Sequence, residues 1–208
     1  MVQIPEKTIT LEEFLKQPET KPASEYINGQ IIQKPVHQRK HSTLQIELAS
    51  AINQAGKAKK LAYVFTELRC TFAGCSIVPD IAIFEWQRIP LDDNGQIVDR
   101  FEIAPDWIVE ILSPEQWTNR VIRKIVFCLK NGTKLSYIID AYAGGCVGIW
   151  EQSLCVESRS QSTSEISFIK RGNYVFLCDR GICASNLPAF YRGNTIMLIS
   201  LAVSVYWL

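Results

Sequence analysis

The sequence predicts a single α/β domain, and three observations support this fold class. The chain has 208 residues, which is enough for one domain with a full hydrophobic core and too short for two ordinary domains. Apolar runs of strand length alternate with amphipathic segments of helical periodicity. Residues 106–140 follow the order strand, helix, strand, which indicates a parallel βαβ crossover.

The N-terminal third is predicted to form a short helix, a hairpin and a longer helix. A capping box that starts at Thr10 predicts the helix 10–19. The dipeptide Asn28-Gly29 favours a tight hairpin turn between two short β-prone runs. Over 41–55 the apolar residues recur at helical spacing, and a lysine-rich polar loop follows.

Four apolar or β-branched runs predict strands. They are 62–72, 76–84, 106–112 and 135–140. The helix 114–130 lies between the last two, with Ser113-Pro114 as a capping residue followed by proline at the first helical position. Gly132 fits the position just after its C-terminus. The apolar stripe of this helix is Val121, Ile125, Cys128 and Leu129.

Charge and cysteine content restrict the function classes. The 22 Lys and Arg against 21 Asp and Glu give a net charge of +1, so any nucleic-acid partner needs a local basic patch. The first residues lack the apolar core of a signal peptide, so we expect a cytoplasmic protein with seven reduced cysteines. The gaps Cys70/Cys75 and Cys178/Cys183 are a weaker indication of zinc, because no histidine completes a set.

Two carboxylates inside strand-like runs are the main candidate site residues. Asp80 lies in SIVPDIAIF and Glu110 in WIVEIL. Burying an ionised carboxylate is expensive, and two on neighbouring strands can offset this cost by sharing a divalent cation. Carboxylate oxygens suit Mg²⁺, which binds through one or two carboxylates and keeps several waters. The alternative is that each carboxylate is a strand-end residue paired with an arginine or with backbone.

A lysine is the third group that phosphodiester hydrolysis would need, to orient water or to stabilise charge on a phosphate. In a standard E-x-K motif the lysine lies two residues after the glutamate. The chain has Leu112 at this position after Glu110, so the motif is absent. Lys124, at the edge of the apolar stripe of the helix 114–130, is the best substitute. The alternative is a solvated surface lysine.

Six segments occur in an order that is more specific than any single motif. They are EYINGQIIQKP, KHSTLQIELASAIN, ELRCTF, SIVPDIAIF, WIVEILSP and LKNGTKLSYIID. This series, over about residues 8–140, closely resembles the Uma-two family of restriction endonuclease-like proteins. The resemblance implies a PD-(D/E)xK restriction endonuclease-like core, in which helices flank a mixed central sheet with Mg²⁺ at its centre.

The resemblance also implies roles for individual residues. Asp80 matches the aspartate of the family's PD motif, and Glu110 matches its second acidic residue. Lys124 falls where the family places a lysine on the following helix. Glu25 matches an acidic residue that completes the metal site, and His41 matches a recurrent histidine. Considered without the resemblance, Glu25 is equally a surface glutamate and His41 a cap-region residue.

A basic cluster before the helix 41–55 is the expected place for contacts with phosphate. Its members are Lys34, His37, Arg39, Lys40 and His41. His41 opens the helix, whose N-terminus attracts phosphate, and Gln45 lies one turn further along the same face. The alternative is that this run is a solvated loop.

These features predict an endonuclease that uses Mg²⁺, or Mn²⁺, to hydrolyse phosphodiester bonds in nucleic acid. DNA is the expected substrate, a homodimer is allowed by analogy with other nucleases of this fold, and no membrane partner is expected. The alternative is a non-catalytic or decayed protein that keeps the nuclease fold as a binding or accessory module. The near-neutral charge and the changed C-terminal segment favour this alternative.

The chain changes character after Asp140. We therefore predict a core over 1–140 and a divergent or frameshifted segment over 141–208, which lacks clear periodicity. The final run TIMLISLAVSVYWL has 14 uncharged residues, fewer than the roughly 20 that span a bilayer. A buried strand or strand pair is predicted there, with a membrane anchor as the alternative.

A shifted reading frame would explain the C-terminal segment, and the coding DNA tests this hypothesis. Translation of the other two frames beyond codon 140 should produce a C-terminus that resembles the family. If neither frame does so, the segment is genuine divergence.

Overall fold

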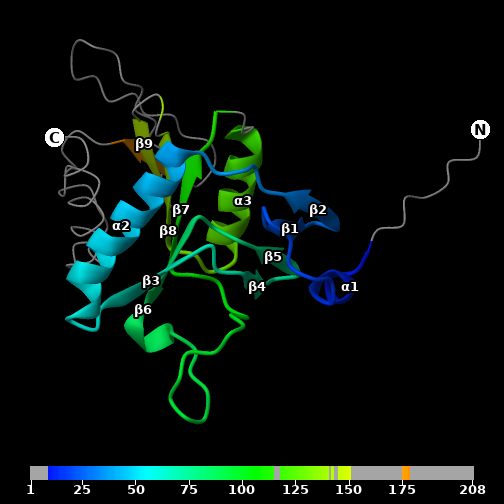
Figure 1. Ribbon diagram of the computed structural model, residues 1–208, viewed down its shortest axis with the longest axis horizontal. Helices are drawn as coiled ribbons and strands as arrows, with labels where there is room; N and C mark the ends of the chain where they lie inside the picture. The colour runs from blue at the N-terminus through cyan, green and yellow to red at the C-terminus, as the bar shows by residue number, and fades with distance from the viewer. Residues whose placement is uncertain (1–8, 115–117, 141, 143–144, 151–174, 179–208) are drawn as a thin grey trace, which may run out of the picture.

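The computed structural model describes residues 9–114, 118–140, 142, 145–150 and 175–178. Within them, a larger and a smaller β-sheet pack with two long helices (Figure 1). The helices are α1 (Leu11–Leu15), α2 (Arg39–Lys57) and α3 (Thr118–Lys130), with a 3₁₀ turn η1 (Trp86–Arg88). The architecture is the mixed α/β fold that the sequence predicts.

The larger sheet has the strand order β10-β9-β8-β7-β6-β3. Its strands are β3 (Ala62–Thr66), β6 (Ile81–Glu85), β7 (Trp107–Leu112), β8 (Leu135–Asp140), β9 (Gly145–Trp150) and β10 (Val175–Cys178). β7 and β8 are parallel and every other pair is antiparallel. The predicted βαβ crossover through α3 is therefore confirmed.

The smaller sheet has the order β2-β1-β5-β4. Its strands are β1 (Ser24–Ile27), β2 (Gln30–Gln33), β4 (Cys70–Phe72) and β5 (Cys75–Ile77). The hairpin between β1 and β2 turns at Asn28 and Gly29, which have φ angles of 52° and 80°. Two consecutive positive φ angles are what the predicted Asn-Gly turn requires.

The two long helices pack on opposite faces of the larger sheet (Figure 1). Odd-numbered side chains of β6 and β7, such as Ile81 and Val109, pack with α2. Even-numbered ones, such as Ala82 and Ile108, pack with α3. Strand side chains alternate between faces, so strands covered on both sides are apolar throughout. This explains why a carboxylate in these runs is conspicuous.

The capping signals are confirmed at the N-terminus of α1 and at the C-terminus of α3. The described part of α3 begins at Thr118, and residues 115–117 after the predicted start at Ser113-Pro114 lie outside the described residues. Thr10 and Glu13 form the predicted capping box, although α1 is shorter than 10–19. Gly132, with φ of 108°, follows the end of α3, and the Thr133 amide donates to the Cys128 carbonyl at 3.0 Å. This bond is the Schellman pattern. α2 begins at Arg39, so His41 lies in its first turn.

Two predicted strands are wrong as continuous elements. The run 62–72 divides into β3 and β4 at Glu67, whose φ is 52°. The run 76–84 divides into β5 and β6 at Val78-Pro79-Asp80. Proline lacks the amide hydrogen that a strand ladder needs, so the chain leaves the smaller sheet here and enters the larger one. These two breaks bring Glu67 and Asp80 together.

The segment after Asp140 contributes strands that the sequence analysis did not predict. β9 and β10 are antiparallel and extend the larger sheet beyond β8. The run TIMLISLAVSVYWL lies outside the described residues. Among the described helices, none is long and apolar enough to cross a membrane.

Candidate functional site

Asp80 lies at the junction between the two sheets and is almost fully buried. Its Oδ1 lies 2.6 Å from the ammonium nitrogen of Lys34. Its Oδ2 accepts a hydrogen bond from the Ile111 amide at 2.7 Å and lies 3.1 Å from Nε2 of His41. Both oxygens therefore have polar partners, as a buried carboxylate requires.

Glu110 lies on β7 next to Asp80. The antiparallel register pairs Ile81 with Val109, so its continuation places Asp80 opposite Glu110. The Glu110 side chain is 1% exposed, and its Oε1 lies 2.8 Å from the ammonium of Lys124. Among the described residues, no donor hydrogen-bonds to its Oε2.

Lys124 connects Glu110 to a third predicted residue. Its ammonium donates to Oε1 of Glu25 at 2.9 Å, and the same oxygen accepts the Val78 amide at 2.8 Å. Lys124 and Glu25 are both buried. The alternatives of a solvated lysine and a surface glutamate are therefore excluded, and the predicted residues Glu25, Glu110 and Lys124 lie together.

His41 and Gln45 are also directed at this site rather than at the surface. Both are buried in α2. Gln45 donates to the Asp80 carbonyl oxygen at 2.6 Å and to Oε1 of Glu67 at 3.0 Å. Arg39 and Lys40 are exposed at the start of the same helix. A role of these four residues in nucleic-acid binding stays a prediction.

Glu67 is a residue of the site that the sequence analysis missed, and Lys34 and His37 were assigned only to phosphate contacts. Lys34 is buried and donates to Glu67 at 3.1 Å and to the Val78 carbonyl at 2.9 Å. It is therefore not part of a solvated loop. Glu67 sits in a strand-like run whose break depends on a positive φ angle. Composition alone did not indicate that break.

Burial and ion pairing change the pKa values of these groups in opposite directions. Burial raises the pKa of Glu110 to about 8, because desolvation outweighs the attraction of Lys124. Burial also opposes ionisation of Asp80, but the Lys34 ammonium and His41 lower the pKa of Asp80 far below its usual range. Burial lowers the pKa of His37, and the neighbouring His41 lowers it further.

The two lysines keep their charge despite burial. Burial alone would lower the pKa of Lys124, but the carboxylates of Glu110, Glu25 and Asp80 raise it. The same competition, with Asp80 as the main carboxylate, raises the pKa of Lys34.

We name as the carboxylate cluster the four acids and two lysines Glu25, Glu67, Asp80, Glu110, Lys34 and Lys124. When all four acids are ionised, this cluster carries a formal charge of −2, which one divalent cation would neutralise.

The residues of the carboxylate cluster fit a hard divalent cation in chemistry. Asp80, Glu110 and Glu25 offer oxygen ligands, and the Oε2 atom of Glu110 is buried without a hydrogen bond from the described residues. These three do not form a group whose ligand atoms all lie within 4.8 Å of one another. Lys34 and Lys124 instead separate the acids as ion-pair partners.

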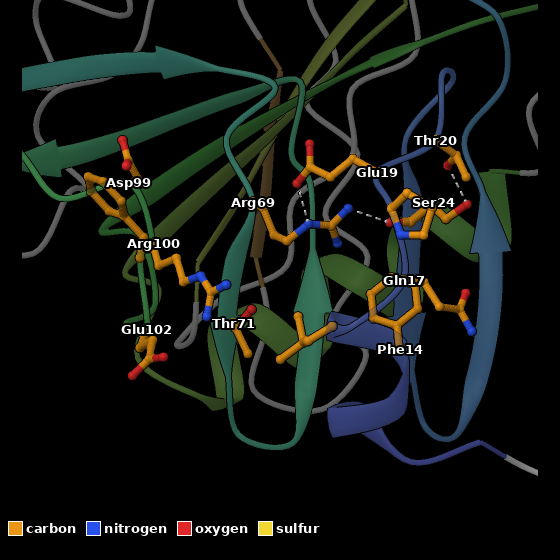
Figure 2. A pocket seen from close by; sticks show the side chains of 13 residues that line it. Phe14, Gln17, Glu19, Thr20, Ser24, Arg69, Thr71, Asp99, Arg100 and Glu102 are labelled. Carbon is orange, nitrogen blue, oxygen red and sulfur yellow. Dashed lines mark hydrogen bonds and ion pairs between the residues drawn. The ribbon is translucent and has the colours of Figure 1, made fainter.

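A separate cavity of about 320 Å³ lies on the side of β1 that faces away from the carboxylate cluster (Figure 2). Ser24 lines it, whereas the next residue, Glu25, contacts Lys124, because adjacent strand residues point to opposite faces. Arg69 lines the cavity and donates hydrogen bonds to Glu19 at 3.0 Å and to the Ser24 carbonyl at 3.1 Å. No predicted site residue lines this cavity.

The fold and this acidic site define a nuclease-like protein with the restriction endonuclease-like fold. The chain belongs to the Uma2 family, described as "Putative restriction endonuclease", whose model matches residues 11–175. A crystal structure of "a putative nuclease belonging to DUF820" from Anabaena variabilis ATCC 29413 is similar, with a TM-score of 0.67 and 42% identity. The match covers 94% of this chain and 99% of that chain. No curated protein matches the chain.

The raised pKa of Glu110 predicts a dependence of stability on pH. Between its ordinary pKa of 4.5 and about 8, the folded protein holds a proton that the unfolded chain has released. The contribution to stability is therefore complete below pH 4.5 and is lost as the pH rises through 8. In metal-free urea unfolding, the free energy of unfolding of the wild type should fall relative to that of Glu110→Gln as the pH rises from 4.5 to about 8. The slope should reach about 1.4 kcal/mol per pH unit.

Glu47→Gln, at an exposed position on α2, is the matched control and should follow the wild-type pH curve. The lowered pKa of Asp80 affects stability only below its ordinary value of 3.8, outside this window. Parallel curves for wild type and Glu110→Gln would contradict the raised pKa.

Proposed function

We propose that this protein is a Mg²⁺-dependent endonuclease that hydrolyses phosphodiester bonds in DNA. The observation that carries this proposal is a pair of buried carboxylates, Glu110 on β7 and Asp80, which the register of β6 and β7 places opposite Glu110. Both belong to a cluster whose formal charge is −2 when all four acids are ionised. The nuclease descriptions of the family and of the similar structure support it.

Asp80, Glu110 and Glu25 are the residues that would hold the ion. An ion held by these residues would supply Lewis-acid chemistry, that is, polarisation of a phosphoryl oxygen and activation of water. Lysines beside the acids limit the repulsion between carboxylates before the ion binds. Mn²⁺ prefers similar oxygen ligands and is an expected substitute.

The protein's own residues position and stabilise the reacting groups. We assign to Lys124 the orientation of the attacking water and the stabilisation of negative charge on the scissile phosphate, because its ammonium stays charged in a buried site. Gln45 and the Ile111 amide fix the backbone and side chain of Asp80. Exposed Arg39 and Lys40 are the candidates for contacts with the DNA backbone.

Cleavage of supercoiled plasmid DNA tests the catalytic assignment. The wild type should nick or cut the plasmid with Mg²⁺ and not with EDTA. Asp80→Asn keeps the side-chain shape and removes the charge, so its rate should fall by roughly a hundredfold or more, the scale of one electrostatic catalytic group.

The control for this substitution is Asp93→Asn in an exposed loop, which makes the same chemical change and should leave cleavage intact. Circular dichroism verifies that Asp80→Asn is folded. Wild-type rates in a folded Asp80→Asn protein would rule out the proposed site.

A thermal melt with Mg²⁺ separates the nuclease from a non-catalytic module with the same fold. A ligand that binds only the folded state stabilises it by about 2.7 kcal/mol at a hundred times its Kd. For a protein of this size we expect Tm to rise by roughly 5–10 °C. The rise should be absent in Glu110→Gln and retained in Glu47→Gln. No rise in the wild type would favour the accessory role.

A further inference from the structure

The two histidines of the chain lie together beside Asp80, and the nuclease proposal does not use them as ligands. The sequence contains two histidines in total, His37 and His41. Their rings are stacked, with centroids 4.0 Å apart and planes 14° from parallel. His37 is partly exposed at 22%, whereas His41 is fully buried. The pair therefore connects the interior of the site to solvent.

Both Nε2 atoms converge on one carboxylate. Nε2 of His41 lies 3.1 Å from Oδ2 of Asp80, and Nε2 of His37 lies 3.7 Å from Oδ1. One ligand atom from each of the three residues lies within 4.8 Å of the others. Zinc bonds of about 2.0–2.1 Å place tetrahedral donors roughly 3.3 Å apart. The separation of 3.1 Å between His41 and Asp80 is close to this value, and the separation of 3.7 Å between His37 and Asp80 is slightly longer.

Two imidazole nitrogens of this pair lack hydrogen bonds within the described part of the chain. They are Nε2 of His37 and Nδ1 of His41, and both atoms are buried. A buried polar atom without a partner carries a cost that a bound ligand removes. Because Nε2 of His37 points at Asp80, an ion between them would satisfy it.

The sequence spacing also suits zinc. His37 and His41 are separated by three residues, within the His-x₃₋₅-His spacing of zinc sites. Imidazole nitrogen favours zinc and other later transition metals, whereas Mg²⁺ prefers oxygen. Glu67 adds a further oxygen 3.7 Å from Nε2 of His37. The donor set is therefore unlike the all-oxygen set of Glu25, Asp80 and Glu110.

We propose that His37, His41 and Asp80 form a binding site for one Zn²⁺ ion, which shares Asp80 with the proposed Mg²⁺ site and differs from it in its two histidine ligands. Lys34 competes for this position, because its ammonium lies 2.6 Å from Oδ1 of Asp80. Lys34 can leave that oxygen and keep its bonds to the Val78 carbonyl and to Glu67. Zn²⁺ binding thus exchanges one cation for another at Asp80.

Nuclear magnetic resonance of the imidazole groups tests this site in the full-length protein without a histidine tag. Only two histidines contribute signals. One equivalent of Zn²⁺ should shift the signals of both, and Mg²⁺ should not reproduce the nitrogen shifts of a metal-bound imidazole. Zinc held by the seven cysteines would leave both histidines unchanged, and this result would overturn the proposal.

Calorimetric titration with Zn²⁺ provides the affinity. His37→Asn removes a partly exposed ligand and should weaken binding by roughly tenfold or more, since even outer-shell partners of a metal have effects of this size. Gln54→Asn, exposed on the same helix, is the control and should bind as the wild type does. An unchanged Kd in His37→Asn also overturns the proposal.

Glu110→Gln separates this site from the proposed nuclease site. The variant should lose the Mg²⁺ effect on Tm and keep the Zn²⁺ shifts of both histidines. A wild type that responds to Zn²⁺ but not to Mg²⁺ would contradict the nuclease proposal alone. A wild type whose Tm rises with Mg²⁺ but whose histidine signals do not shift with Zn²⁺ would contradict the zinc site alone.

Discussion

The structure depends on keeping Asp80 ionised inside the protein. This carboxylate is 2% exposed, and its charge is balanced by Lys34, by His41 and by the Ile111 amide. These partners come from the loop after β2, from α2 and from β7. A buried charge without such partners would cost several kcal/mol. The stability of the fold therefore depends on all three elements keeping their contacts with Asp80.

The same constraint explains why two predicted strands are interrupted. Had the chain continued as a strand through Val78 and Asp80, the Val78 amide and carbonyl would have been used by a sheet ladder. Instead the amide binds Glu25 and the carbonyl binds Lys34. The break at Glu67 has a similar effect, because the Glu67 amide donates a hydrogen bond to the Asp80 carbonyl at 3.3 Å. Irregular backbone at the junction of the sheets thus becomes part of the site.

Lys34 and Lys124 divide the carboxylate cluster into two halves. Lys34 is shared by Asp80 and Glu67, and Lys124 is shared by Glu25 and Glu110. Glu110 is the less compensated acid, which is why burial dominates its pKa while ion pairing dominates that of Asp80. Two adjacent carboxylates with such different pKa values are an arrangement typical of functional sites.

The sequence by itself determined the α/β class, the hairpin turn, the C-terminal end of α3, the acidic residue of β7 and the PD motif. These features depend on local signals, namely apolar periodicity, turn residues and charges within apolar runs. Helical periodicity indicated Lys124, and the resemblance to a family added Glu25, whose contact with Lys124 spans 99 residues of chain. Only the tertiary structure decided that Lys34, His37 and Glu67 surround Asp80 and that β9 and β10 extend the sheet. Local sequence could not reveal these contacts, because each depends on backbone breaks and pairings between segments that are distant along the chain.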